Sequence, residues 1–189
     1  MFSTIGIAVV ILLTSLLGYA ARKPDTFRVQ RAKSIQAPPE EIFALIFTLI
    51  NDFHRWGSWS PYEKLDPAMK RTYSGAANGK GAVYEWAGKG KAGEGHMEIT
   101  EASPRSTVTI KLDFFKPFEG HNMAEFTLEA YGDATNVTWA MQGSQCYLVK
   151  VMSIFSSMDN LVGKDFEAGL ASMKAVAEIN SNQRSALCN

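Results

Sequence analysis

Histidine and cysteine, two residue types that often perform catalysis or bind metals, are few in this sequence and widely separated. Its three histidines, His54, His96 and His121, are scattered along the chain, and their spacing fits neither a metal site nor a catalytic triad. We therefore expect surface or capping roles for all three histidines and no bound metal.

A glycine-rich stretch at residues 88–93, GKGKAG, has the G-x-G-x-x-G spacing of dinucleotide-binding proteins. That motif works when a helix follows it, because the amino terminus of the helix holds the phosphate. Here the following residues alternate like a strand, so we expect a mobile hairpin and no cofactor. The sequence also contains no P-loop, no H-E-x-x-H motif and no nucleophile elbow.

Acid/base catalysis on a hydrophobic substrate would need a titratable side chain that faces the interior, where desolvation moves its pKa toward neutrality. The phenol of Tyr84 is the one such group in the inward-facing sets given below. It could orient a ligand, or it could be satisfied within the core. Glu85 follows in the opposite strand phase, and Asp165 lies at the edge of a helical stripe.

A long amphipathic helix is predicted at residues 155–179. Its apolar residues recur at steps of three or four and form one continuous stripe, while charged residues occupy the other side. Such a stripe needs a large concave partner. The stripe consists of Met158, Val162, Phe166, Leu170, Met173 and Ala177.

The sequence upstream of this helix reads mainly as strands, with turn residues between them. We predict an α+β helix-grip fold, in which a curved antiparallel sheet of seven strands wraps around the long carboxy-terminal helix. A broadly apolar helix that opens at residues 37–41 and ends at Asn51 and Asp52 follows the first strand. The seven strands are expected at residues 27–36, 69–74, 81–87, 93–101, 107–115, 122–131 and 135–142.

The inward faces of the strands and the helix should line an apolar, aromatic cavity, because residues in period-two phase point to one side of a sheet. Trp59 belongs to an irregular aromatic segment, residues 53–62, that either closes the core or lines a ligand entrance. The predicted ligand-binding residues are Trp59, Tyr84, Trp86, Met97, Ile99, Ile110, Leu112, Phe114, Phe126, Trp139, Met141, Met158, Val162 and Phe166.

The amino-terminal residues 2–21 carry no charge and are long enough to span a bilayer as a helix. A cleaved signal peptide is the rival interpretation, because Gly18-Tyr19-Ala20 offers small residues at roughly the spacing of a cleavage site. However, no cation precedes the apolar run and several follow it, including Arg22, Lys23 and Arg28, which favours an uncleaved single-pass anchor with a cytoplasmic domain. We expect an anchor at residues 1–22, a domain at 26–180 and a flexible tail at 181–189.

The overall composition of the 189 residues narrows the possible partners. Basic and acidic residues number 19 each, so no charge excess favours nucleic acid. The two cysteines, Cys146 and Cys188, lie far apart in the sequence and are expected to be free thiols in a reducing compartment.

Several segments resemble the START-like superfamily, and more narrowly its polyketide cyclase/dehydrase-related branch, the SRPBCC proteins. The resemblance covers about residues 27–179 and implies a helix-grip fold that encloses an apolar cavity. The activities it implies range from lipid carriage through polyketide ring closure to hormone sensing, and no family catalytic motif is matched. The segments are WGSWSP (56–61), GEGHMEI (93–99), KPFE (116–119), VTW (137–139) and GKDFEAGL (163–170).

Two functions from different classes follow. The preferred hypothesis is a membrane-anchored, non-catalytic binding protein for a hydrophobic small molecule such as a lipid, an isoprenoid or a polyketide-like compound. The alternative is a cyclase or dehydratase that encloses a reactive polyketide, with Tyr84, Glu85 or His96 as the proton shuttle. A strand bulge near Gly93 or Gly95 would be needed to turn His96 inward. A scaffold with a solid core is a third possibility.

Overall fold

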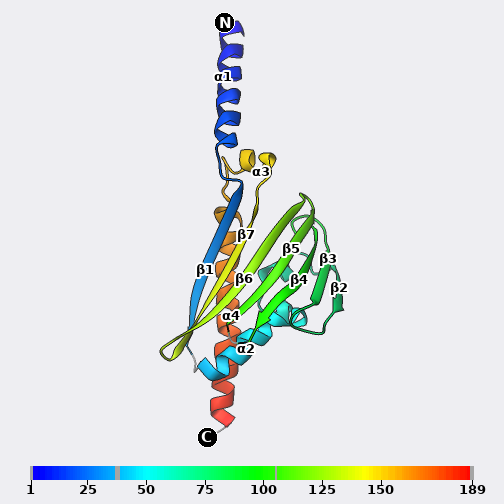
Figure 1. Cartoon of the computed structure of the whole chain (residues 1–189), viewed down its shortest axis with the longest axis vertical. Helices are drawn as coiled ribbons and strands as arrows, with labels where there is room; N and C mark the ends of the chain where they lie inside the picture. The colour runs from blue at the N-terminus through cyan, green and yellow to red at the C-terminus, as the bar shows by residue number, and fades with distance from the viewer. Residues whose placement is uncertain (1, 37–38, 105, 188–189) are drawn as a thin grey trace.

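A seven-stranded sheet curves around the carboxy-terminal helix, and the amino-terminal helix projects from one end of the sheet (Figure 1). The computed structural model describes residues 2–36, 39–104 and 106–187. The elements occur in the order α1 (Phe2–Ala21), β1 (Thr26–Gln36), α2 (Pro39–Asn51), η1 (Phe53–Ser58), η2 (Pro61–Lys64), β2 (Lys70–Gly75), β3 (Ala82–Ala87), β4 (Glu94–Ser103), β5 (Thr107–Lys116), β6 (Gly120–Tyr131), β7 (Ala134–Ser144), α3 (Tyr147–Met152) and α4 (Met158–Leu187).

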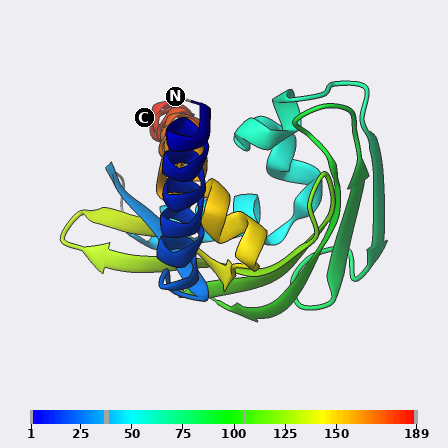
Figure 2. The ribbon, with the colours of Figure 1, turned by 90° about the horizontal axis from the view of Figure 1, so that it is seen from above.

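The strands form one antiparallel sheet in the order β1-β7-β6-β5-β4-β3-β2. Six of the seven therefore follow one another as hairpins, and β1 joins at the edge beside β7. The sheet is strongly curved, and its concave side holds α2, the short helices η1 and η2, and α4 (Figure 2). The α+β helix-grip prediction, with seven strands near the expected positions, is confirmed.

The aromatic segment after α2 closes the end of that helix. The last carbonyl groups of a helix have no partner within it. The indole nitrogens of Trp56 and Trp59 donate hydrogen bonds of 2.9 Å to the carbonyls of Ile50 and Leu49, respectively. Both rings are buried. This arrangement favours the core-closing interpretation of the segment over the ligand-entrance one.

The apolar stripe of α4 packs against the inner side of the sheet, and its members Phe166, Leu170, Met173 and Ala177 are buried. The helix begins at Met158, three residues later than the predicted start at residue 155, because residues 153–157 form a turn after α3. It continues to Leu187, past the predicted end at residue 179. Residues 181–187 are thus helical, and the domain limits at residues 22, 26 and 180 stay predictions.

The amino-terminal helix α1 projects from the end of the sheet where β1 begins (Figure 1). Residues Thr4–Ala21 have a mean hydropathy of 2.1 and are almost entirely exposed, so the helix is long and apolar enough to cross a membrane. A signal sequence has the same length and composition. The structure thus confirms an apolar helix, and whether it anchors the chain belongs to the function proposed below.

Candidate ligand-binding site

The sheet and α4 bring the predicted ligand-binding residues together in one hydrophobic cluster. Most of them are buried, and a smaller group is only partly covered. The buried residues are Trp59, Tyr84, Met97, Ile99, Ile110, Leu112, Phe126, Trp139, Met141 and Phe166. The partly covered ones are Trp86, Phe114, Met158 and Val162.

Stacked aromatic rings fill the middle of the grip. The ring of Trp139 lies face to face with Phe166, with ring centroids 4.1 Å apart, and also stacks on Phe126 at 4.9 Å. Trp59 meets Trp139 edge-on at 5.6 Å. Gly169 of α4 lies so close that a Cβ there would be 2.8 Å from the Trp139 ring. This part of the predicted cavity is therefore occupied by the protein's own side chains.

The indole nitrogen of Trp139 has no hydrogen-bond partner among the described residues, although the atom is buried. Leaving a buried donor unpaired costs about 1–3 kcal/mol. A ligand oxygen that reached this nitrogen would remove that cost, so the aromatic stack offers one polar contact as well as apolar surface.

The partly covered residues gather at one end of the grip. Trp86 lies at the end of β3, Phe114 near the end of β5, and Met158 and Val162 in the first turns of α4, and Phe27 at the start of β1 joins them. All these positions lie at the end of the sheet from which α1 projects (Figure 1). We call these five residues the open-end cluster. It continues the apolar core toward solvent on the side of α1.

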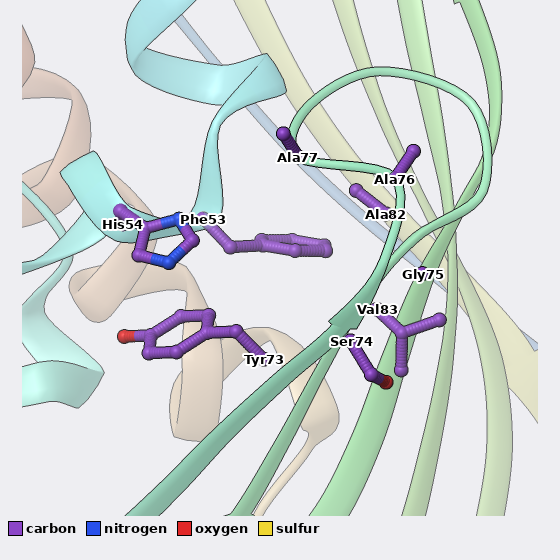
Figure 3. A pocket seen from close by; sticks show the side chains of 9 residues that line it. All are labelled: Phe53, His54, Tyr73, Ser74, Gly75, Ala76, Ala77, Ala82 and Val83. Atoms are coloured by element: carbon purple, nitrogen blue, oxygen red, sulfur yellow. The ribbon is translucent and has the colours of Figure 1, made fainter.

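The structure shows two hollows. One, of about 180 Å³, is bounded by Phe53, His54, Tyr73 and the turn between β2 and β3 (Figure 3). The other, of about 600 Å³, is lined by the outward-facing residues Arg28, Lys111 and Gln142 and also by Phe27 of the open-end cluster. The described residues that line these hollows include none of the predicted ligand-binding residues.

The sequence did not predict that a hydrogen-bonded cluster of ionisable side chains would lie beside the apolar interior. The phenol of Tyr84 donates a hydrogen bond of 2.6 Å to Glu63 Oε1, and Arg71 Nε donates one of 2.7 Å to Glu63 Oε2. The Glu63 side chain is only 10% exposed. Tyr84 is thus the one titratable group of the predicted inward-facing sets, and η2, which belongs to none of those sets, adds Glu63 beside it.

The electrostatics of this cluster favour a neutral phenol. Burial raises the pKa of Tyr84, and its hydrogen bond to Glu63 raises it further. The hydrogen bond to Glu63 also raises the pKa of the Arg71 guanidinium. Both Glu63 carboxylate oxygens already accept a hydrogen bond from within the cluster. This favours a structural role for the three residues over acid/base catalysis.

The other two proposed proton shuttles lie outside the grip. Glu85 is 53% exposed at its side chain, and His96 Nδ1 lies 3.6 Å from its carboxylate on the outer face of the sheet. The ladder between β4 and β5 does shift at Glu94 and Gly95, as expected for a bulge. Gly95 nevertheless remains the inward position, because a Cβ there would overlap the Trp86 ring. His96 accordingly stays outside.

Glu63 is the polar residue that sequence reasoning missed. It lies in a four-residue helix without apolar periodicity, so no pattern indicates on which side of the chain it falls. Phe27 of the open-end cluster was predicted to alternate within the first strand but was not assigned to the site. Whether Phe27 belongs to this cluster depends on the distance between β1 and α4, and no local sequence pattern indicates that distance.

Comparison with known proteins supports the architecture. A family model described as "Polyketide cyclase / dehydrase and lipid transport" matches residues 26–178. A search among curated proteins finds no match.

Among solved structures, XoxI from Bacillus cereus is 15% identical with a TM-score of 0.56, over 79% of this chain and 94% of that one. A protein from Thermus thermophilus is 14% identical with a TM-score of 0.54, over 82% and 99% of the two chains. Ara h 8.0201 is 12% identical with a TM-score of 0.52, over 80% and 97%. At these identities the likeness establishes the fold alone.

Proposed function

Because the chain belongs to the polyketide cyclase/dehydrase and lipid transport family of SRPBCC proteins, we propose that it is a non-catalytic binding protein for one hydrophobic small molecule. The ligand class we propose is a lipid, an isoprenoid or a polyketide-like compound. We further propose that α1 anchors the protein in a membrane as a single span, with the domain on the cytoplasmic side.

The open-end cluster carries the proposal. Its side chains are apolar but only partly covered, and they pack against the buried hydrophobic core. A hydrophobic ligand gains roughly 25 cal/mol for each Å² of apolar surface that it removes from water. Because aromatic rings fill the middle of the grip, we place the ligand between those rings and the α1 end of the domain. The deeper predicted residues would then form the floor of the site.

An enzymatic role has less support. Glu85 and His96 lie on the outer face, and the Tyr84 phenol already donates its proton to Glu63 in a hydrogen bond. A general acid or base needs to reach its substrate at hydrogen-bond distance. Positioning of a reactive substrate alone is the form of catalysis that this interior still permits.

The test begins with native mass spectrometry of the full chain, purified in mild detergent from cells and after incubation with a lipid panel. We expect a bound hydrophobic molecule and a rise in melting temperature with the ligand that binds best. A panel in which nothing binds or stabilises the protein would end the proposal.

A substitution then locates the ligand. Val162→Trp adds bulk within the open-end cluster and should reduce ligand occupancy at least tenfold, which corresponds to about 1.4 kcal/mol. The matched control is Lys164→Trp, because Lys164 is exposed on the other side of the same helix turn. Equal occupancy in the two variants would contradict the assigned position while leaving ligand binding itself intact.

A further inference from the structure

The short helix α3 and the turn after it expose apolar side chains and bury a charged one. Leu148 is 56% exposed, Met152 48% and Phe155 78%, whereas Lys150 is only 7% exposed. The Lys150 ammonium is held by an ion pair with Asp25 in the linker after α1. This is the reverse of the pattern that a short surface helix shows in water.

Direct contacts fix α3 to the base of α1. The Tyr147 hydroxyl donates a hydrogen bond of 2.9 Å to the carbonyl of Leu17, which belongs to the last turns of α1. Lys23 Nζ donates to the carbonyl of Ser153, at 2.6 Å, and to its hydroxyl, at 3.0 Å. Both ends of the α3 segment are therefore tied to the end of the apolar helix (Figure 1).

These contacts set the depth of α3 relative to α1. Leu17 lies four residues before the end of α1 at Ala21, which corresponds to about 6 Å along a helix. If α1 spans a bilayer, Tyr147 lies at the level of its last turn, where tyrosine side chains concentrate in membrane proteins. The ammonium groups of Lys23 and Lys150 then lie at the level of the lipid headgroups.

We propose that α3 and the following turn, residues 147–155, lie in the interface of the same bilayer, with Leu148, Met152 and Phe155 inserted among the lipid acyl chains. This inference rests on the membrane anchor of the proposed function. Elements of this kind enter the headgroup and acyl boundary by about 5–10 Å, which matches the depth set by Leu17.

Lipid is the occupant that the surroundings of α3 favour. Most large aliphatic side chains of α1 are themselves between 45% and 66% exposed, and Tyr147 joins α3 to the last turns of that helix. One medium that covers α1 therefore also covers α3. The open-end cluster lies at the same end of the domain, so docking in this orientation turns the proposed ligand site toward the membrane.

The experiment uses the full chain in nanodiscs of phosphatidylcholine and phosphatidylglycerol. In the Cys188→Ser variant, a polarity-sensitive fluorophore is attached to the exposed thiol of Cys146, directly before α3. The control probe is placed on the β6–β7 hairpin at the other end of the sheet, in the variant Tyr131→Cys, Cys146→Ser, Cys188→Ser. Quenching is measured with lipids that carry a spin label on the upper acyl chain.

We expect quenching at Cys146 to exceed that at the hairpin several-fold. In the Cys188→Ser background, Leu148→Ser combined with Phe155→Ser should reduce it toward the hairpin value, whereas Tyr131→Ser should leave it unchanged. Equal quenching at both probe sites overturns the proposal. The proposal is also overturned if the fluorophore at Cys146 reports an apolar environment only in nanodiscs that hold two chains, because a second copy would then cover α3.

Carbonate extraction of membranes distinguishes a failure of the membrane anchor from a failure of α3 docking. If the chain is released, the membrane anchor fails and the docking of α3 fails with it. If the chain is retained while the two probes quench equally, only the docking is overturned. Ligand occupancy, measured independently by mass spectrometry, shows in either case whether the binding function stands.

Discussion

Glu63 connects the short helix η2 to the two strands at one edge of the sheet, β2 and β3. Its carboxylate receives the phenol of Tyr84 from β3 and the guanidinium of Arg71 from β2, and Arg71 also donates to the backbone carbonyls of Met69 and Glu63. Hydrogen bonds to charged groups contribute about 1.5–3 kcal/mol to stability. This network therefore holds η2 against the far edge of the sheet.

Glu63→Gln should lower the free energy of unfolding by about 1.5–3 kcal/mol. The amide loses the negative charge that strengthens both hydrogen bonds, and when its oxygen accepts from Arg71 its NH₂ group faces the Tyr84 oxygen, so the phenol loses Glu63 as the acceptor of its own proton. Denaturant titration of the full chain in mild detergent would measure the change by tryptophan fluorescence. All four tryptophans lie after α1, so the signal reports on the domain.

The matched control is Glu85→Gln, one residue after Tyr84 but on the outer face, where we expect a change within about 0.5 kcal/mol. If Glu63→Gln proved as neutral as the control, the cluster would carry no stability. The role of Glu63 as a structural anchor would then have to be abandoned.

At the residue scale, strand phase was the informative signal. Alternation correctly predicted that Met97, Ile99 and Phe126 are buried and that Glu85 and His96 lie outside. Alternation did not predict the position of Glu63, because a segment without a regular period does not indicate which of its side chains face the interior. Alternation also could not show that the rings of Trp139 and Phe166 would stack and fill the space between sheet and helix.

At the element scale, α4 is held by apolar packing on one side and by charge on the other. Arg31 of β1 bonds to Asp159 at 2.7 and 2.9 Å and to Glu167 at 2.6 Å. The two carboxylates are eight residues apart on α4, and Gly163 between them leaves room for the guanidinium, which would overlap a Cβ at that position. The hydrogen bond from Arg31 lowers the pKa of Asp159.

Phe166→Ala tests the apolar side of this docking. Removing a buried aromatic ring typically costs about 3–5 kcal/mol, because it loses transfer free energy and leaves a cavity. Phe166 is 1% exposed and lies flat on Trp139, so we expect a loss in that range together with a changed tryptophan emission spectrum. The same denaturant titration measures it.

Lys164→Ala, on the exposed side of the helix, serves as the control and should change the stability by no more than about 0.5 kcal/mol. A loss below about 1 kcal/mol for Phe166→Ala would mean that α4 is not held by this stack. The helix-grip packing of the middle of the domain would then need another explanation.

Elements with a strong period were predictable, and those without one were not. The seven strands and the stripe of α4 follow from alternation and from helical spacing over ten or more residues. The helix α3 has only six residues, and its apolar side chains point outward. A stretch of this length contains too little periodicity to distinguish it from a loop, so its exposed face became visible only in the folded chain.

At the scale of the whole molecule, the two ends of the grip differ. The aromatic segment and α2 close the interior on one side with buried rings, and the open-end cluster, α3 and the base of α1 lie together at the other end. The sequence predicted both the apolar amino-terminal helix and the domain behind it. It could not predict that the open-end cluster would lie at the same end of the domain as that helix.

We predict that the domain lies on the cytoplasmic side of the membrane. The cations that follow α1, including Arg22 and Lys23, favour a cytoplasmic domain, because positively charged residues flanking a span remain on that side. In bacterial spheroplasts that express the Tyr131→Cys, Cys146→Ser, Cys188→Ser variant, a membrane-impermeant maleimide should label the hairpin thiol only after permeabilisation. The intact mass of the purified chain, measured by mass spectrometry, should show that residues 2–21 are still present. Labelling of unpermeabilised spheroplasts would place the domain outside, and a mass that lacks the apolar helix would make that helix a signal sequence. Loss of the helix would remove the lipid contact on which the docking of α3 depends, whereas an outside domain would only move that contact to the other leaflet.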